Sequence, residues 1–264
     1  MKNFQDNFVQ GIGNTPLIKL KTASELTKCN IYGKAEFLNP GGSVKDRAAL
    51  ALIRDAEKKK LISAGGIIVE GTAGNTGIGL CLIGNSLGYK TIIVMNENQT
   101  QEKKDLLINI GADLRLVPAK PYSDKDNFVK VACRLAKELS PNNNNGVVWA
   151  NQFDNTANSQ GHYDSTGPEI WEQTEGRIDG FVCSSGTGGT IAGISNALKE
   201  NNKNVKIFLA DPKGSALYNY ITNGELKSEG GSITEGIGSS RITKNFAEAK
   251  IDGAFSISDQ ESLP

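Results

Sequence analysis

The segment from Ile67 to Met95 reads IIVEGTAGNTGIGLCLIGNSLGYKTIIVM, and it decides the fold. Its first four residues are a short apolar run that predicts a buried strand, and Thr91–Met95 is rich in β-branched residues and predicts a second strand. Between the two, a glycine-rich loop leads into an apolar segment, Ile78–Leu87, that predicts a helix. A strand, a helix and a strand in this order are typical of parallel strand pairing.

The same alternation runs along most of the chain. It predicts an α/β fold with a mainly parallel sheet and helices on both faces, and such sheets bind ligands outside the carboxyl ends of their strands. The polar run Asn142–Gly146 is where we expect the chain to cross between domains. The predicted strands are Ile31–Phe37, Ile67–Glu70, Thr91–Met95, Asp113–Val117, Val147–Ala150, Ile178–Ser184, Val205–Asp211 and Ala254–Ile257, and the predicted helices are Val44–Leu61, Ile78–Leu87, Thr100–Ile110, Asn127–Leu139, Gly167–Gln173 and Ile191–Lys199.

Composition and charge exclude several classes of protein. The 264 residues contain 29 Lys+Arg and 29 Asp+Glu, which argues against a nucleic-acid binder or a polybasic membrane binder. The longest apolar runs are only a few residues, too short to cross a bilayer, and the N-terminus has no apolar signal core. Four scattered cysteines without a CxxC pair, together with a single histidine, predict no metal site and a reducing, cytoplasmic setting.

The first of three glycine-rich loops with chemical potential is Asn39–Arg47, which reads NPGGSVKDR. Ser43 can cap the following helix, with Asp46 three residues on completing a capping box. Lys45 then falls in the first helical turn, where the positive end of the helix dipole disfavours an ammonium ion. A free amine is the nucleophile that forms a Schiff base, although most lysines in a first turn simply point into water.

The second loop, Gly71–Gly77, lies between a predicted strand and a predicted helix. Its glycines let the backbone wrap closely around a ligand, and helix N-terminal amides attract anions. Thr72, Asn75 and Thr76 add side-chain donors, and no charged residue follows Glu70 within the loop. The loop therefore suits a small anion such as a carboxylate, with an ordinary strand-to-helix turn as the alternative.

The third loop, Ser184–Thr190, again joins a predicted strand to a predicted helix and is of the phosphate-binding type. It is no Walker loop, since no Gly-Lys-Ser/Thr follows, and no dinucleotide fingerprint, since Ile191 stands where the third glycine belongs. Without a nearby Lys or Arg the loop suits an anchored cofactor tail better than a phosphoryl group in transfer. Taken together, a phosphate anchor, a carboxylate loop and Lys45 fit pyridoxal phosphate and an amino-acid substrate.

Seven motifs in order resemble one family. They are Gly13–Leu17, Asn39–Arg47, Gly71–Gly77, Asn151–Phe153, Thr166–Trp171, Gly186–Thr190 and Glu235–Gly238. With them the chain resembles the cysteine synthase group (O-acetylserine sulfhydrylases, with cystathionine β-synthase-like enzymes) of fold-type II pyridoxal-phosphate enzymes. The resemblance implies two three-layer α/β/α domains with mainly parallel twisted sheets, like those of the tryptophan synthase β chain. Residues 1–38 plus 150–264 would form the larger, phosphate-binding domain, and 39–149 the smaller mobile substrate-loop domain.

The same resemblance implies roles for individual residues. Lys45 would be the catalytic residue, as the Schiff-base lysine and the proton shuttle at the substrate α-carbon. The cofactor-binding residues would be Lys45, Asn75 on the ring hydroxyl, and Gly186, Thr187, Gly188, Gly189 and Thr190 on the phosphate. The substrate-binding residues would be Thr72, Ala73, Gly74, Thr76, Gln152 and Gly236.

The implied reaction is a β-replacement. O-acetyl-L-serine and sulfide would give L-cysteine through an aminoacrylate intermediate, in a cytoplasmic homodimer with no nucleic-acid or membrane partner. Related reactions stay open: those of cystathionine β-synthase, cyanoalanine synthase and serine dehydratase. From other classes, a catalytically impaired paralogue and a nucleotide-binding regulator that uses the third loop also remain possible.

Two features depart from the family pattern. Ala73 stands where the family usually has a serine, so one hydroxyl is lost from the carboxylate loop. The family also continues past Pro264 with a glycine-serine segment that meets the pyridine nitrogen. Because Ser258 and Glu261 form a capping box just before the last residues, we expect the chain to be a fragment. His162 is interpreted as a structural histidine and Ser184 and Ser185 as loop donors.

Overall fold

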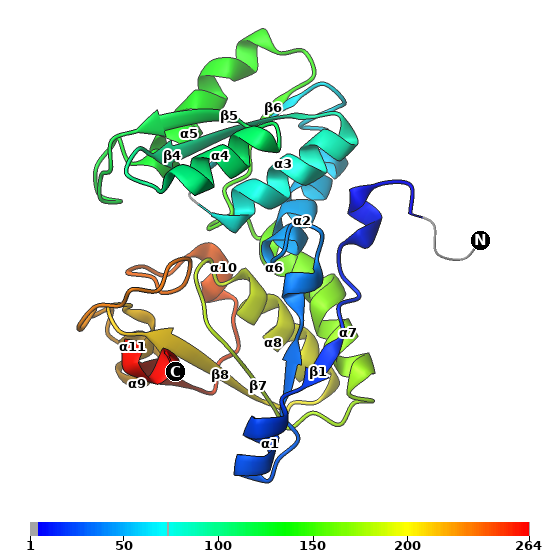
Figure 1. Ribbon diagram of the computed structural model, residues 1–264, viewed down its shortest axis with the longest axis vertical. Helices are drawn as coiled ribbons and strands as arrows, with labels where there is room; N and C mark the ends of the chain where they lie inside the picture. The colour runs from blue at the N-terminus through cyan, green and yellow to red at the C-terminus, as the bar shows by residue number, and fades with distance from the viewer. Residues whose placement is uncertain (1–4, 73, 264) are drawn as a thin grey trace. The chain divides into compact units, whose positions relative to one another are not determined.

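The computed structural model describes residues 5–72 and 74–263. The chain divides into two compact units, Met1–Gln152 and Phe153–Pro264 (Figure 1). Each unit is built around its own parallel sheet. The domain boundaries implied by the family resemblance stay a prediction.

The first unit opens with a small antiparallel pair of strands, β1 (Leu17–Lys19) and β2 (Tyr32–Lys34). The strand predicted over Ile31–Phe37 is shorter than expected, because the chain turns into the 3-10 helix η2 at Glu36. Sequence periodicity did not indicate three elements of this region. They are η1 (Phe8–Gly11), β1 and α1 (Lys21–Thr27).

The centre of the first unit is a four-stranded parallel sheet with the strand order β5-β4-β3-β6. Each predicted strand and helix of this region is present, with ends shifted by a few residues at most. The elements are α2 (Lys45–Lys58), β3 (Ile67–Gly71), α3 (Asn75–Leu87), β4 (Lys90–Asn96), α4 (Gln101–Asn109), β5 (Asp113–Val117), α5 (Phe128–Leu139), η3 (Ser140–Asn142) and β6 (Val147–Trp149).

Helices cover both faces of this sheet, as predicted. Val69 and Val94 face α5, where they pack with Ala132, and Ile93 faces α3 and α4, where it packs with Cys81. All of these side chains are fully buried. The β-branched runs of the central strands form strands because both of their faces are buried in this way.

The strand order creates a switch point beside β3. From β3 the chain runs through α3 to β4 and through α4 to β5 on one side, and then returns through α5 to β6 on the other side (Figure 1). Open parallel sheets bind ligands at such a point, outside the carboxyl ends of the strands. The residues that follow β3 and β6, at Thr72 and Asn151, therefore occupy the expected place for a ligand site in this unit.

The second unit has a three-stranded parallel sheet with the order β7-β8-β9. Ile207 and Leu209 of β8 pack with Ile191 and Ile194 of α8. On the other face Val182 and Phe255 remain more than half exposed. The elements are α6 (Ala157–Gly161), the π-helix η4 (His162–Thr166), α7 (Gly167–Gln173), β7 (Gly180–Cys183), α8 (Gly189–Asn201), β8 (Lys206–Pro212), α9 (Leu217–Asn223), α10 (Lys244–Ala247), β9 (Gly253–Ile257) and α11 (Asp259–Ser262).

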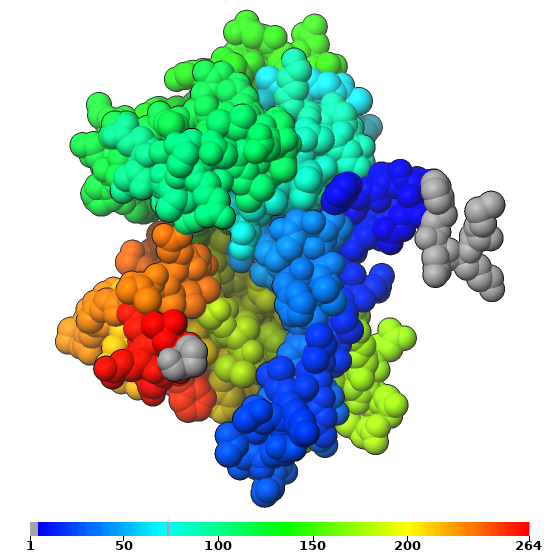
Figure 2. All heavy atoms as spheres, viewed as in Figure 1, coloured from blue at the N-terminus to red at the C-terminus, as the bar shows by residue number. Residues whose placement is uncertain are grey.

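The last helix, α11, begins with the predicted capping box. The Ser258 hydroxyl accepts a hydrogen bond from the Glu261 N–H, and the Glu261 carboxylate accepts one from the Ser258 N–H. Asp259 also accepts hydrogen bonds from the Ser232 hydroxyl and the Ile233 N–H. These bonds connect α11 to the segment around Ser232. In the space-filling view the red atoms of α11 lie against orange atoms of this part of the chain (Figure 2).

Candidate active site

Lys45 is the first residue of α2 and is half-buried. A tight turn precedes it, in which the Gly42 N–H donates to the Asn39 carbonyl at 2.8 Å and Gly42 has a φ of 77°. The Gly41 N–H donates to the Asp46 carboxylate at 2.5 Å, and a Cβ on Gly41 would lie 2.4 Å from the same carboxylate. Glycine is therefore required at 41 by close approach and at 42 by conformation.

The predicted capping box at the start of α2 is wrong in its partners. The Ser43 hydroxyl accepts from the Lys45 N–H at 3.2 Å, so Ser43 does serve the helix start. Asp46, however, bonds to Gly41 instead of reaching back to Ser43. Burial raises the pKa of Asp46, and its second oxygen has no hydrogen-bond partner among the described residues. The carboxyl thus fixes the glycine turn in front of Lys45.

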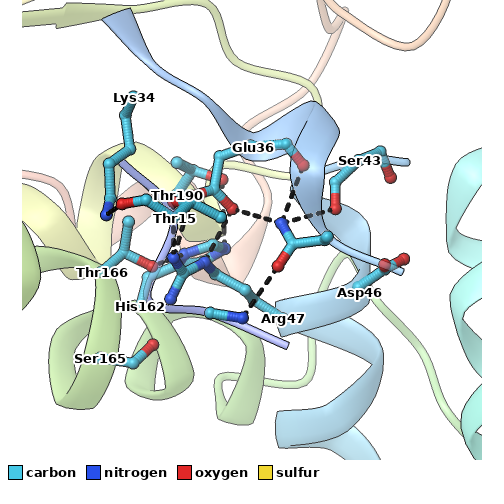
Figure 3. A network of polar contacts seen from close by, with 12 residues as sticks. Thr15, Lys34, Glu36, Ser43, Asp46, Arg47, His162, Ser165, Thr166 and Thr190 are labelled. Carbon is cyan, nitrogen blue, oxygen red and sulfur yellow. Dashed lines mark hydrogen bonds and ion pairs between the residues drawn. The ribbon is translucent and has the colours of Figure 1, made fainter. Parts of the chain in front are cut away.

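An ion pair between the buried Arg47 and the largely buried Glu36 supports this turn. The Arg47 guanidinium donates to both Glu36 oxygens, at 2.7 and 2.9 Å, and the Thr15 hydroxyl donates to Glu36 at 2.6 Å (Figure 3). The Asn39 amide donates to the Glu36 carboxylate at 2.8 Å and accepts from the Gly13 N–H at 2.9 Å. Burial acts to raise the pKa of Glu36, but the hydrogen bonds from Arg47 and Thr15 outweigh it and lower that pKa. The sequence analysis did not predict the pairing of Arg47 with Glu36, because no local pattern indicates it.

The carboxylate loop follows β3, and α3 begins earlier than predicted, at Asn75. Asn75 and Thr76 therefore lie in the first helical turn. Thr72 is buried; its N–H donates to the Val94 carbonyl at 3.0 Å, and its hydroxyl accepts from the Gly74 N–H at 3.3 Å. Asn75 is exposed, and a Cβ at Gly74 would meet no atom within 4 Å. The predicted site residue Ala73 lies outside the described residues.

Gln152 meets this loop from the end of β6. The Thr76 hydroxyl donates to the Gln152 side-chain oxygen at 2.6 Å, and both residues are at least 95% buried. The turn before Gln152 is left-handed, with a φ of 52° at Asn151. The structure thus brings Thr72, Gly74, Thr76 and Gln152 together at the switch point of the first sheet, as the resemblance implied for a carboxylate-binding cluster.

In the second unit, the predicted phosphate loop connects β7 to α8 and depends on three glycines. A Cβ at Gly186 would lie 2.3 Å from the Gly236 carbonyl oxygen, and one at Gly188 would lie 2.5 Å from the Phe246 Cα. A Cβ at Gly189 would lie 2.2 Å from the Asn158 side chain. These close approaches explain why the three positions are glycine.

The donors of this loop fit a phosphate group. The structure records no acceptor for the backbone N–H groups of Thr190 and Ile191, at the start of α8, within the described part of the chain. The Ser185 hydroxyl is buried and has no partner among the described residues. Amides at a helix N-terminus and unpaired hydroxyls are what a phosphate monoester accepts from. The residues present therefore fit the phosphate end of a cofactor.

Gly236 lies beside the phosphate loop. It has a φ of 80°, and a Cβ there would meet no atom within 4 Å. The Gly238 N–H donates to the Ser185 carbonyl at 2.8 Å, which ties the segment Glu235–Gly238 to the loop. The second unit thus brings Gly186–Thr190 and Gly236 together.

His162 is buried in the π-helix η4 of the second unit. Its Nδ1 lies 2.8 Å from the Thr166 hydroxyl and its Nε2 lies 3.2 Å from the Thr190 hydroxyl (Figure 3). Hydrogen bonds at both ring nitrogens agree with the structural role expected of this residue, and they connect it to the last residue of the phosphate loop.

Neither a metal cluster nor a membrane-spanning helix is present among the described residues. Across residues 5–72 and 74–263, no group of three or more His, Cys, Asp or Glu side chains is arranged to hold a metal ion. Over the same residues, none of the helices combines the length and apolar character that membrane crossing demands.

Comparison with known proteins identifies the family. The sequence profile of a family described as "Pyridoxal-phosphate dependent enzyme" matches residues 9–263. Cysteine synthase 1 of Emericella nidulans is 51% identical over 267 residues, which cover 99% of this chain and 71% of that protein. Cysteine synthase 1 of Neurospora crassa is also 51% identical, over 96% of this chain and 67% of that protein.

A solved structure of a related enzyme has a similar fold. The O-acetylserine dependent cystathionine beta-synthase from Helicobacter pylori has a TM-score of 0.81 at 33% identity, covering 97% of this chain and 80% of that one. The α/β class with mainly parallel sheets is thereby confirmed. The chain belongs to the family of pyridoxal-phosphate dependent enzymes, and pyridoxal phosphate is its cofactor.

Proposed function

We propose that this chain is a cysteine synthase-type transferase that replaces the acetoxy group of O-acetyl-L-serine with sulfide. A C–O bond at the substrate β-carbon breaks, a C–S bond forms, and the products are L-cysteine and acetate. The observation that carries the proposal is the position of Lys45 at the first residue of α2, behind a turn braced by the Glu36–Arg47 pair.

The residues that the family resemblance assigns to the cofactor would hold it. The N–H groups and hydroxyls of Gly186–Thr190 would bind its phosphate, Asn75 would bond its ring hydroxyl, and Lys45 would bind its aldehyde carbon. Once bound, pyridoxal phosphate supplies the electron sink for charge that develops at the substrate α-carbon. Gly236, which carries no side chain, leaves room beside the phosphate loop for the substrate.

The carboxylate loop would orient the amino acid. Thr72, Thr76 and Gln152, with Gly74, would bind the substrate carboxylate, which fixes the α-carbon relative to the base. The Lys45 Nζ removes the proton at that α-carbon and later returns one to the same atom. Burial of Thr76 and Gln152 keeps bulk water away from these donors.

The test is product analysis with purified protein reconstituted with pyridoxal phosphate. We expect O-acetyl-L-serine and sulfide to give L-cysteine, Lys45→Ala to abolish the product, and Lys58→Ala, an exposed lysine at the other end of α2, to leave the rate unchanged. Pyruvate from L-serine with no L-cysteine from O-acetyl-L-serine would refute the proposal.

A second candidate keeps the site and changes the nucleophile. The cystathionine beta-synthase of Apis mellifera is 43% identical to this chain over 261 residues, which cover 97% of this chain and 50% of that protein. This similarity favours L-homocysteine as an alternative sulfur donor. Competition between sulfide and L-homocysteine in one reaction decides between the two. A larger kcat/KM for L-homocysteine would make cystathionine synthesis the principal reaction.

We further propose that the enzyme is a cytoplasmic homodimer, in which residues 39–149 form a smaller mobile domain and residues 1–38 with 150–264 form the larger one. The family resemblance supports the dimer and the two domains. The four cysteines are scattered along the sequence without a CxxC pair, which supports a reducing compartment. Light scattering measures the dimer, cell fractionation the compartment, and limited proteolysis with and without O-acetyl-L-serine the domains.

A further inference from the structure

One carboxyl group of the first unit has no part in the proposed reaction and is nevertheless fully buried at the switch point. Glu70 is the fourth residue of β3 and is 0% exposed. It pairs in register with Ile93, so it belongs to the face of the sheet that α3 and α4 cover. A buried carboxyl group needs partners, because burial without them is costly.

The partners of Glu70 are two consecutive backbone N–H groups and the side chain of Gln152. The Asn151 N–H donates to its Oε2 at 2.7 Å, and the Gln152 N–H approaches its Oε1 at 3.4 Å. Both belong to the turn after β6, where the Ala150 N–H makes the last bond to β3, at the Val69 carbonyl. Asn151 is in the left-handed region, which is costly for a residue other than glycine unless the surroundings enforce it. The Glu70 carboxyl accepts the hydrogen bond of the residue in this conformation.

The turn fixed by Glu70 places the Gln152 side chain. Gln152 accepts the hydrogen bond from Thr76 in the first turn of α3, at 2.6 Å. A chain of contacts therefore runs from Glu70 through the backbone of Gln152 to its side chain and on to Thr76. It links the end of β3, the turn after β6 and the start of α3, which are the three segments of the carboxylate-binding cluster.

We propose that Glu70 is a positioning residue that sets the substrate-carboxylate end of the site by holding the Asn151–Gln152 turn. The inference rests on the proposed function, whose substrate carries the carboxylate in question. It predicts that loss of the Glu70 carboxyl raises the KM for O-acetyl-L-serine and leaves kcat and the KM for sulfide almost unchanged, because Glu70 touches neither the reacting atoms nor the second substrate.

The charge of Glu70 provides a second signature. Burial raises the pKa of Glu70 to about 8, against the lowering effect of hydrogen bonds from Asn151 and Gln152. No charged side chain acts on it from the described residues: α3 and β6 carry none, and Lys90 lies at the far end of β4. The charged residues of α4 (Glu102, Lys103, Lys104 and Asp105) and those of α5 do not contribute. Near neutral pH the group is therefore an uncharged acid, and above about pH 8 it becomes a negative charge beside a site for a carboxylate.

The experiment compares wild type, Glu70→Gln, Glu70→Ala and the control Glu57→Gln, a carboxyl-to-amide change on α2. The KM for O-acetyl-L-serine is measured from pH 7 to pH 9 for each protein. Titration of the substrate affects every protein alike, so it cancels in the ratio of the wild-type KM to the variant KM. We expect Glu70→Gln to match wild type at pH 7 within about threefold, and the ratio to rise about tenfold by pH 9, as like charges disfavour each other. Glu57→Gln should keep a flat ratio.

Glu70→Ala should raise the KM about tenfold, with kcat within about threefold of wild type, because two buried N–H groups lose their acceptor. An unchanged KM, or a pH-independent ratio for Glu70→Gln, would overturn the proposal. If Glu70→Ala does not fold, the pH series of Glu70→Gln decides alone.

Hydrogen exchange separates this inference from the proposed function. The amides of Asn151 and Gln152 should exchange faster in Glu70→Ala than in wild type, whether or not the protein turns over O-acetyl-L-serine. A wild-type protein without turnover contradicts the proposed function, whereas equal exchange of these two amides in wild type and Glu70→Ala contradicts the role of Glu70.

Discussion

Replacing Glu70 by glutamine should change how the stability of the first unit depends on pH. The pKa of Glu70 is raised to about 8 in the folded chain, against 4.5 for an ordinary glutamic acid. Between these two pH values the folded state holds a proton that the unfolded state has released. The free energy of unfolding of the wild type therefore falls by about 1.4 kcal/mol for each pH unit in that window. Below pH 4.5 the contribution is complete, and above pH 8 it is lost.

Glutamine has no proton to lose, so the difference in unfolding free energy between Glu70→Gln and wild type isolates this one group. It should increase in favour of the variant by about 3 kcal/mol from pH 5 to pH 7 and level off above about pH 8. Full burial of Glu70 means that solvent does not screen the effect. The sign is opposite for a carboxyl with a lowered pKa such as Glu57, whose stabilising contribution is lost as the pH falls.

The assay is urea unfolding of the cofactor-free protein at five pH values from 5 to 9. The chain has two tryptophans, Trp149 in β6 of the first unit and Trp171 in α7 of the second. A Trp171→Phe background lets the fluorescence report on the first unit alone. If the stability curves of wild type and Glu70→Gln run parallel in this background, the carboxyl is ionised at neutral pH and the reasoning is refuted.

Three further predictions concern the cofactor and substrate loops. Arg47→Met leaves Glu36 buried without its cation and should destabilise the first unit by about 3–5 kcal/mol, measured by urea unfolding; a loss below about 1 kcal/mol would contradict the bracing role. Gly188→Ala places a Cβ 2.5 Å from the Phe246 Cα and should abolish pyridoxal-phosphate binding measured by equilibrium dialysis, and wild-type affinity would disprove the close approach. Ala73→Ser restores a hydroxyl worth about 1 kcal/mol, so the KM for O-acetyl-L-serine should fall about fivefold, whereas no change would separate that position from the carboxylate.

Local signals explain which elements the sequence predicts well. The helix at Gly167–Gln173 and the strand at Asp113–Val117 match their predicted bounds, because Pro168 marks the helix start and an alternating apolar pattern marks the strand. The helix Lys21–Thr27 was missed because its sequence, KTASELT, has no apolar stripe, and its Leu26 is 79% exposed.

Contacts between distant residues explain what the sequence could not predict. The glycine-rich loops and Lys45 are visible as motifs because each is a continuous segment. The supports of those loops are not: Glu70 reaches Gln152 across 82 residues, and Asn158 reaches Thr187 across 29. The partners of Asp46 likewise depend on how the glycine turn folds back, which a capping-box pattern does not contain.

The most direct test of the account is the chemical identity of the residue that carries the cofactor. Borohydride reduction of the protein loaded with pyridoxal phosphate, followed by proteolysis and mass spectrometry, should place one pyridoxyl group on the peptide that contains Lys45. A pyridoxyl group on any other lysine, or on none, would contradict the central claim that the amine at the start of α2 holds the cofactor.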